Sequence, residues 1–115
     1  MKRGGRRKQI KNSNLNIFST NAAGLKNKVL SFKNQIKSTD AAIFTVQETH
    51  FARKGMLQLE NFEIFEAIRV KKHGGTLIGV HKALEPVLIQ EYSEHFELLV
   101  VEVVIAGKEI RIITG

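Results

Sequence analysis

The sequence predicts an α/β domain in which a mixed sheet is combined with one main helix. Short apolar runs rich in β-branched residues recur along the chain between turn-forming residues, a pattern typical of strands. One stretch has its apolar residues at helical spacing instead. Two pairs of runs are close enough in the chain to form hairpins. At 115 residues the chain is too short for two domains, and its 43% hydrophobic content suits a single core.

Positive charge is concentrated in residues 1–14, which we expect to form a disordered basic arm ahead of a domain over residues 15–115. The net charge is +7, and six of these charges come from Lys2, Arg3, Arg6, Arg7, Lys8 and Lys11. These six are the candidate nucleic-acid-binding residues, because clustered cations attract a polyanion. The alternative is a tail that only keeps the protein soluble.

Composition also excludes several classes of protein. The chain has no cysteine, which excludes a disulfide scaffold and every thiolate metal site. No apolar run of secretory type follows the arm, and none approaches the length of a membrane span. We therefore expect an intracellular protein without a membrane partner, and the sequence does not distinguish nucleus from cytoplasm.

The first half of the domain is expected to form a strand, a helix and a second strand. Residues 15–20 alternate and end at the turn-forming segment 21–24. The helix that follows has one apolar stripe made by Leu25, Val29, Phe32 and Ile36. Residues 41–46 are almost entirely apolar, which suits an interior strand that is covered on both faces.

Two hairpins are expected in the second half. Residues 62–69 and 76–81 form the first, and a short strand over 87–90 separates it from the second, formed by 98–105 and 110–114 with Ile105 opposite Ile110. One face of the second hairpin carries Leu99, Val101, Val103, Ile105, Ile110 and Ile112, and the other carries Leu98, Val100, Glu102, Val104, Arg111 and Ile113.

Both faces of this last hairpin are largely apolar. Six aliphatic side chains left in water would forgo about 10 kcal/mol, as much as the whole stability of a typical domain. The single helix stripe covers one sheet face only. We therefore expect a missing carboxyl-terminal half or a partner chain to cover the sheet.

Two polar residues occupy matching places, Asn21 just beyond the first strand and Glu48 just beyond the apolar second strand. If the helix joins these strands in parallel as a right-handed crossover, both side chains emerge at one edge of the sheet. A carboxylate and an amide there offer the oxygen ligands that Mg²⁺ prefers. The alternative is a turn asparagine and an exposed glutamate, and spacing alone leaves both open.

Three motifs occur in a fixed order: residues 16–25 with Asn21 and Gly24, residues 46–50 reading Val-Gln-Glu-Thr-His, and residues 74–78 reading Gly-Gly-Thr-Leu-Ile. This pattern resembles the endonuclease/exonuclease/phosphatase superfamily, which has the DNase I-like fold. It is most similar to the endonuclease domain of non-LTR retrotransposons and to abasic-site endonucleases. The resemblance spans residues 15–115 and covers only the amino-terminal half of the family's domain.

The resemblance implies half of a four-layer α/β sandwich that hydrolyses phosphodiester bonds in nucleic acid, DNA rather than RNA, with Mg²⁺ or Mn²⁺. It implies that Glu48 is the principal metal ligand and that Asn21 lies in the phosphate and metal site, so both are candidate catalytic and metal-binding residues. His50 is expected at the edge of the site. Gly74 and Gly75 match a glycine pair that opens a core strand, where close backbone packing explains them.

The family's later motifs, an Asp-x-Asn strand end and a terminal Asp-His pair, have no counterpart in this chain. Its one aspartate is Asp40, and no histidine adjoins an aspartate. The resemblance therefore implies a partial site without a general base, and a retroelement-derived nuclease that is inactive alone. The alternatives are a non-catalytic nucleic-acid-binding remnant that uses the basic arm, and an unstable fragment with no function of its own.

Overall fold

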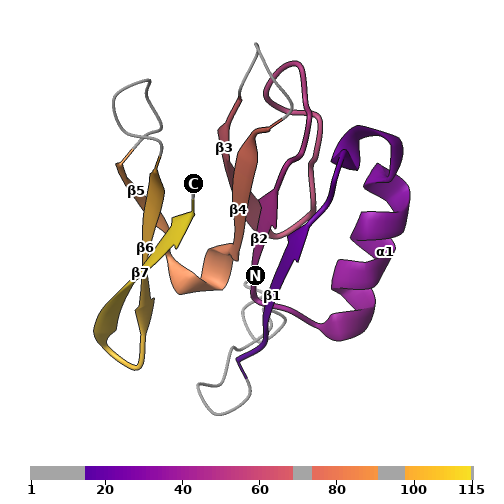
Figure 1. The fold of residues 1–115 in the computed structure, drawn as a ribbon. Coiled ribbons are helices and arrows are strands. Elements are labelled where there is room, and N and C mark those ends of the chain that lie inside the picture. The colour runs from indigo at the N-terminus through magenta and orange to yellow at the C-terminus, as the bar shows by residue number, and fades with distance from the viewer. Residues whose placement is uncertain (1–14, 69–73, 91–97, 115) are drawn as a thin grey trace.

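The computed structural model describes residues 15–68, 74–90 and 98–114. The elements run in the order shown in Figure 1: β1 (Ile17–Asn21), η3 (Leu25–Asn27), α1 (Val29–Thr39), β2 (Ile43–Gln47), β3 (Phe62–Ala67), β4 (Thr76–His81), η4 (Lys82–Leu84), β5 (Val87–Gln90), β6 (Leu99–Ile105) and β7 (Lys108–Thr114). The basic arm of residues 1–14 lies outside the described residues. Among those described, no helix has the length and apolar character needed to cross a membrane.

The strands form two sheets. The first has the strand order β1-β2-β4-β3, with β1 and β2 parallel and the other pairs antiparallel, so it is mixed. The second is an antiparallel sheet in the order β5-β6-β7. Together with α1 they confirm the predicted fold class, a mixed α/β architecture with one main helix.

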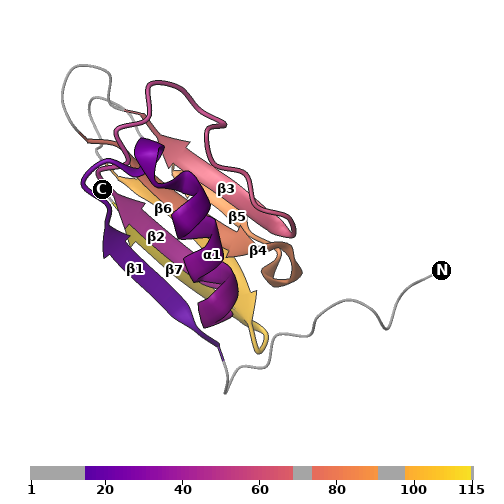
Figure 2. The same cartoon turned by 90° about the vertical axis from the view of Figure 1, so that its right-hand side faces the viewer.

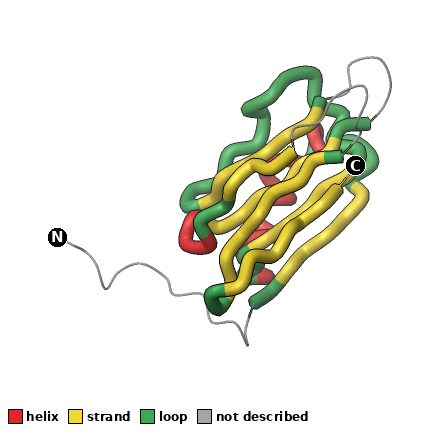
Figure 3. Tube along the Cα trace, turned by 90° about the vertical axis from the view of Figure 1, so that its left-hand side faces the viewer, coloured by secondary structure: helices red, strands yellow, loops and turns green. Residues whose placement is uncertain are grey.

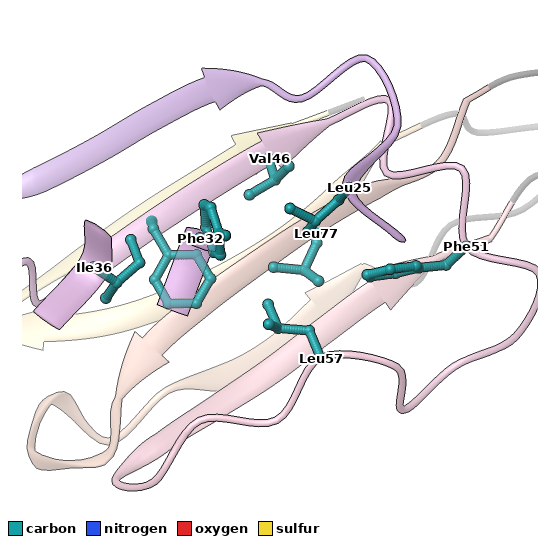
Figure 4. Packing of buried hydrophobic residues seen from close by; sticks show 8 residues of the cluster. Leu25, Phe32, Ile36, Val46, Phe51, Leu57 and Leu77 are labelled. Atoms are coloured by element: carbon teal, nitrogen blue, oxygen red, sulfur yellow. The ribbon is translucent and has the colours of Figure 1, made fainter. Parts of the chain in front are cut away.

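The helix covers one face of the four-stranded sheet. Figure 2 shows α1 in front of this sheet, with the three-stranded sheet behind it. The core beneath the helix is built from Leu25, Phe32, Ile36, Phe44, Val46, Phe51, Leu57 and Leu77 (Figure 4). The rings of Phe32 and Phe44 meet edge to face, with their centroids 5.4 Å apart. Phe51 and Leu57 come from the loop between β2 and β3, so this loop is part of the core.

The second core lies between the two sheets. Its buried members are Ala42, Ile43, Ile78, Val80, Leu84, Leu99, Val101 and Val103. The helix was expected to cover one face of the β6–β7 hairpin, but the four-stranded sheet covers this inner face instead. The described layers are thus helix, sheet and sheet, and Figure 3 shows the strands in front of the helices when the molecule is seen from the side of the second sheet.

The outer face of the three-stranded sheet carries exposed apolar side chains. Val104 and Ile113 are 40% and 58% exposed. Within the described part of the chain, these side chains belong to neither core. The expected cover by a missing half or a partner chain stays a prediction.

The helix begins later than its apolar stripe indicates. Leu25 belongs to a separate 3-10 turn, and Lys28, with φ −130° and ψ 18°, interrupts the helical backbone before Val29. Lys28 N donates to Leu25 O at 2.8 Å, which closes the 3-10 turn, and Leu25 N donates to Thr49 O at 2.8 Å, which ties this turn to the segment after β2. The apolar spacing correctly places Leu25 in the core but does not reveal the break in the helical backbone.

The second hairpin is tighter than expected. Ile105 lies opposite Lys108, not Ile110, across a two-residue turn of Ala106 and Gly107 with φ values of 55° and 76°. Two positive φ values are characteristic of a type I′ turn, whose twist matches that of the flanking strands. The register differs from the expected one by two residues, so each side chain keeps its predicted face.

Candidate metal and phosphate site

Asn21 and Glu48 meet at one edge of the four-stranded sheet. Asn21 ends β1 and pairs with Gln47 at the end of β2, so the parallel register puts Glu48 next to it. The amide Nδ2 of Asn21 donates a hydrogen bond of 2.8 Å to Oε2 of Glu48. The crossover expected from the sequence therefore exists, and it brings the two candidate residues into direct contact.

The orientation of the Asn21 amide is determined by hydrogen bonds at both of its atoms. Its Oδ1 accepts from Ala23 N at 3.1 Å, which only an oxygen can do, and its Nδ2 faces the carboxylate, which only accepts. Asn21 thus closes a local turn with one end and holds Glu48 with the other. The second lone pair of Oδ1 is available to a water or an ion.

Glu48 has an open side and a side that faces His50. Its side chain is 48% exposed, whereas that of His50 is 21% exposed. The Nε2 atom of His50 lies 3.8 Å from Oε1 of Glu48. One carboxylate oxygen thus contacts the Asn21 amide, the other lies near the imidazole, and a ligand can approach from solvent.

The backbone around Glu48 is fixed by hydrogen bonds on one side to the β1–α1 connection. Three consecutive carbonyls accept from this connection, in the pairs Ala22 N to Gln47 O, Gly24 N to Glu48 O and Leu25 N to Thr49 O, each at 2.8 Å. Lys28 supports the same connection, because its Nζ donates to Ala22 O at 3.2 Å. The segment after β2 therefore continues its pairing beyond the last strand residue.

On the other side, the same segment is bonded to the glycines that precede β4. Thr49 N donates to Gly75 O at 3.3 Å, and His50 N donates to Gly74 O at 2.8 Å. Glu48 and His50 both have left-handed backbone conformations, with φ values of 57° and 60°. Such conformations cost energy in residues other than glycine and persist where the surroundings fix them. The carboxylate is thus held in place before any ligand arrives.

Two glycines are required because the chain approaches the site closely. A Cβ atom on Gly75 would lie 2.6 Å from Thr49 Oγ1, and one on Gly24 would lie 3.2 Å from His50 Nδ1. Of the glycine pair predicted to allow close packing, Gly75 does so, and the atom nearest to it belongs to the Thr49 side chain. Thr49 is 1% exposed, and the sequence pattern did not predict its burial. Its position between Glu48 and His50 in the Gln-Glu-Thr-His motif is the feature of the sequence that could have indicated a role in the site.

The donor atoms at this edge suit a partly hydrated divalent cation. Mg²⁺ is commonly held by one or two carboxylates and completes its shell with waters or phosphate oxygens. Glu48 supplies an exposed carboxylate, and Asn21 holds it through the amide nitrogen, while the amide oxygen accepts from Ala23 N. Among the described residues there is no cluster of three or more His, Asp or Glu side chains able to hold a metal. One carboxylate would leave most positions around such an ion to waters or phosphate oxygens.

The structure brings together three of the predicted site residues, Asn21, Glu48 and His50. The six cationic residues of the arm, predicted to bind nucleic acid, lie outside the described residues and have no assigned place. Asp40 is at the far edge of the sheet, because it precedes β2 and five strand residues span about 17 Å.

Comparison with known proteins identifies the fold. No family model and no curated protein matches the sequence. The AP endonuclease LMAP from Leishmania major matches with a TM-score of 0.65 over 84% of this chain, at 15% identity. An AP endonuclease from Archaeoglobus fulgidus matches with a TM-score of 0.58, also over 84%, at 17% identity. The chain has part of the DNase I-like fold.

The likeness to these AP endonucleases is one of fold. The chain spans 38% and 39% of the length of the two solved structures. In this DNase I-like arrangement, Asn21 and Glu48 occupy the carboxyl ends of a parallel strand pair. Ligands of open α/β sheets collect at such an edge.

Proposed function

We propose that the chain is part of a divalent-metal-dependent nuclease that hydrolyses phosphodiester bonds. The observation that supports this most directly is the 2.8 Å hydrogen bond between Asn21 and the exposed carboxylate of Glu48, at the strand edge of a DNase I-like fold. Two solved structures of similar fold are named as AP endonucleases. The substrate proposed for this chain is nucleic acid, DNA rather than RNA.

Each of the three residues has its own role in this proposal. Glu48 provides the carboxylate that binds Mg²⁺ or Mn²⁺, and Asn21 fixes that carboxylate and offers Oδ1 to a water or a phosphate. The ion, when bound, neutralises charge on the scissile phosphate. His50 limits the site on the Oε1 side of Glu48 and contributes no proton transfer.

The proposal includes inactivity of this chain alone. A nuclease of this kind needs a general base within hydrogen-bond reach of the attacking water. Among the described residues, Asp40 and His81 lie at the opposite edge of the sheet from Glu48. The base and the other ligands would come from sequence beyond residue 115. The Gln-Glu-Thr-His motif supports an origin in a retroelement endonuclease.

The test is cleavage of duplex DNA, with and without an abasic site, by a protein in which this chain continues past Gly115. We expect nicking that requires Mg²⁺ and disappears in the Glu48→Gln variant, which keeps the size of the side chain but loses its charge. A Glu63→Gln variant, altered at an exposed glutamate on β3, is the matched control. Undiminished cleavage by Glu48→Gln refutes the proposal.

A second candidate function is supported by the charge distribution. Six of the seven net positive charges lie in the first 11 residues, so the arm could bind nucleic acid without catalysis. Deletion of residues 1–11 distinguishes the two functions. If binding is lost on deletion and Mn²⁺ does not change the melting temperature of the remaining domain, the binding module is the better account.

A further inference from the structure

The loop between β2 and β3 carries two cations and is attached at the end of the sheet that also carries the candidate site. Phe51 and Leu57 flank residues 52–56 of this loop. They are 2% and 1% exposed and lie in the core beneath α1. Between them, residues 52–55 are all exposed and include Arg53 and Lys54. We call residues 52–55 the basic loop. Its two buried neighbours limit how far it can move.

Glu66 attaches the basic loop to the sheet. Gly55 N donates a hydrogen bond of 2.8 Å to Oε2 of Glu66 on β3. The neighbour of Glu66, Ala67, pairs with Thr76, and Thr76 pairs with Gln47, so this bond lies near the edge that carries Glu48. Figure 1 shows the β2–β3 loop rising at the same end of the sheet as the β1–α1 connection.

The other oxygen of Glu66 is costly to the fold. Its Oε1 is withdrawn from solvent and has no hydrogen-bond partner within the part of the chain that the structure describes. A buried polar atom without a partner destabilises a protein, typically by about 1–3 kcal/mol. A glutamate at this position is therefore a poor choice for stability alone. Its one observed bond holds the basic loop.

The end of β3, to which the loop is attached, lies close to the candidate site. β4 is the one strand between β2 and β3, so their ends are about 10 Å apart, which is two strand spacings. Duplex DNA carries one phosphate charge per about 1.7 Å of helix axis, so a duplex bound beside Glu48 has further phosphates over such a distance.

We propose that the basic loop is a binding site for the DNA backbone, with Arg53 and Lys54 contacting phosphates near the scissile one, and that Glu66 is its positioning residue. This inference rests on the proposed function, because it takes the Glu48 edge as the place of cleavage. Binding itself needs no metal, so it can be measured apart from the Glu48 site.

The experiment measures binding of the full chain to a 20-base-pair duplex in EDTA over a range of salt concentrations. Each phosphate contact contributes about 0.9 to the slope of log affinity against log salt. Replacing Arg53 and Lys54 together by alanine should reduce this slope by about 1.8, without changing the melting temperature. The basic arm is present in every variant and contributes equally to each.

Variants of Glu66 separate positioning from simple charge. Glu66→Ala removes a negative charge, which by itself should strengthen DNA binding, whereas loss of the loop's attachment should weaken it and reduce the slope. Glu66→Gln keeps an oxygen for Gly55 N and should bind DNA at least as well as the unmodified chain. Glu63→Ala removes an exposed charge from the same strand and should not weaken binding.

Three results would overturn the inference. They are an unchanged slope in the Arg53 and Lys54 double variant, tighter binding by Glu66→Ala, and no binding of duplex by the unmodified chain. If Glu66→Ala does not fold, the double variant and Glu66→Gln still decide. A different result refutes the proposed function, namely undiminished Mg²⁺-dependent cleavage by Glu48→Gln. The two failures are therefore distinguishable.

Discussion

Asn21 and Glu48 are 27 positions apart in the sequence, and their side chains are joined by a hydrogen bond of 2.8 Å. The parallel pairing of β1 and β2, with α1 as the crossover between them, produces this contact. Asn21 is the last residue of β1, and Glu48 directly follows β2. The backbone of the segment after β2 is hydrogen-bonded on two sides, to the β1–α1 connection and to the glycines before β4. The geometry of the candidate site is therefore a property of the fold and does not require a ligand to assemble it.

Replacing Asn21 should weaken metal binding without removing it. In Asn21→Ala the carboxylate of Glu48 remains but loses the amide that orients it. Loss of such a supporting hydrogen bond typically reduces metal affinity by about 10- to 100-fold. A Mn²⁺ titration of the variant measures this change. An affinity equal to that of the unmodified chain would show that Asn21 has no part in the site.

Gly75→Ala should destabilise the domain more than Gly107→Ala does. Both glycines have positive φ, of 90° and 76°, and both substitutions therefore strain the backbone, by about 1–2 kcal/mol. Only at Gly75 would the new Cβ meet another atom closely, Thr49 Oγ1 at 2.6 Å, whereas at Gly107 nothing lies within 4 Å. Urea denaturation of both variants measures the difference. Equal losses of stability would contradict the close packing described at the site.

Gly79 should not tolerate a side chain while Phe44 is present. Its φ is not in the left-handed region, but an added Cβ would overlap the ring of Phe44, which is fully buried. Overpacking of this kind typically costs about 1–3 kcal/mol. Gly79→Ala should therefore lower the free energy of unfolding, and combining it with Phe44→Leu should cost less than the sum of the two single changes. Additive losses would show that the ring does not set this limit.

Much of the fold follows from local patterns. The strands β4 and β5 coincide with the predicted ranges, and the helical stripe correctly identifies Phe32 and Ile36 as core residues. The helix starts at Val29, later than its apolar stripe indicates, because the backbone of Lys28 is not helical, and apolar spacing carries no information about such a break.

The candidate site could be predicted only in part. The positions of Asn21 and Glu48 at strand ends predicted their meeting, because parallel strands share a carboxyl edge. The burial of Thr49 and the bond between Gly55 and Glu66 could not be predicted, since both depend on how a loop folds back onto the sheet. Sequence patterns describe strands and helices well, but they do not show where a loop folds back onto a sheet.

The central claim is that Glu48, held by Asn21, binds a divalent cation. Its most direct test is a Mn²⁺ titration of the full chain followed by electron paramagnetic resonance, because the signal of free Mn²⁺ falls when the ion binds. We predict binding at a single site in the unmodified chain and loss of that binding in Glu48→Gln. Binding of Mn²⁺ by Glu48→Gln as tight as that of the unmodified chain would contradict the claim.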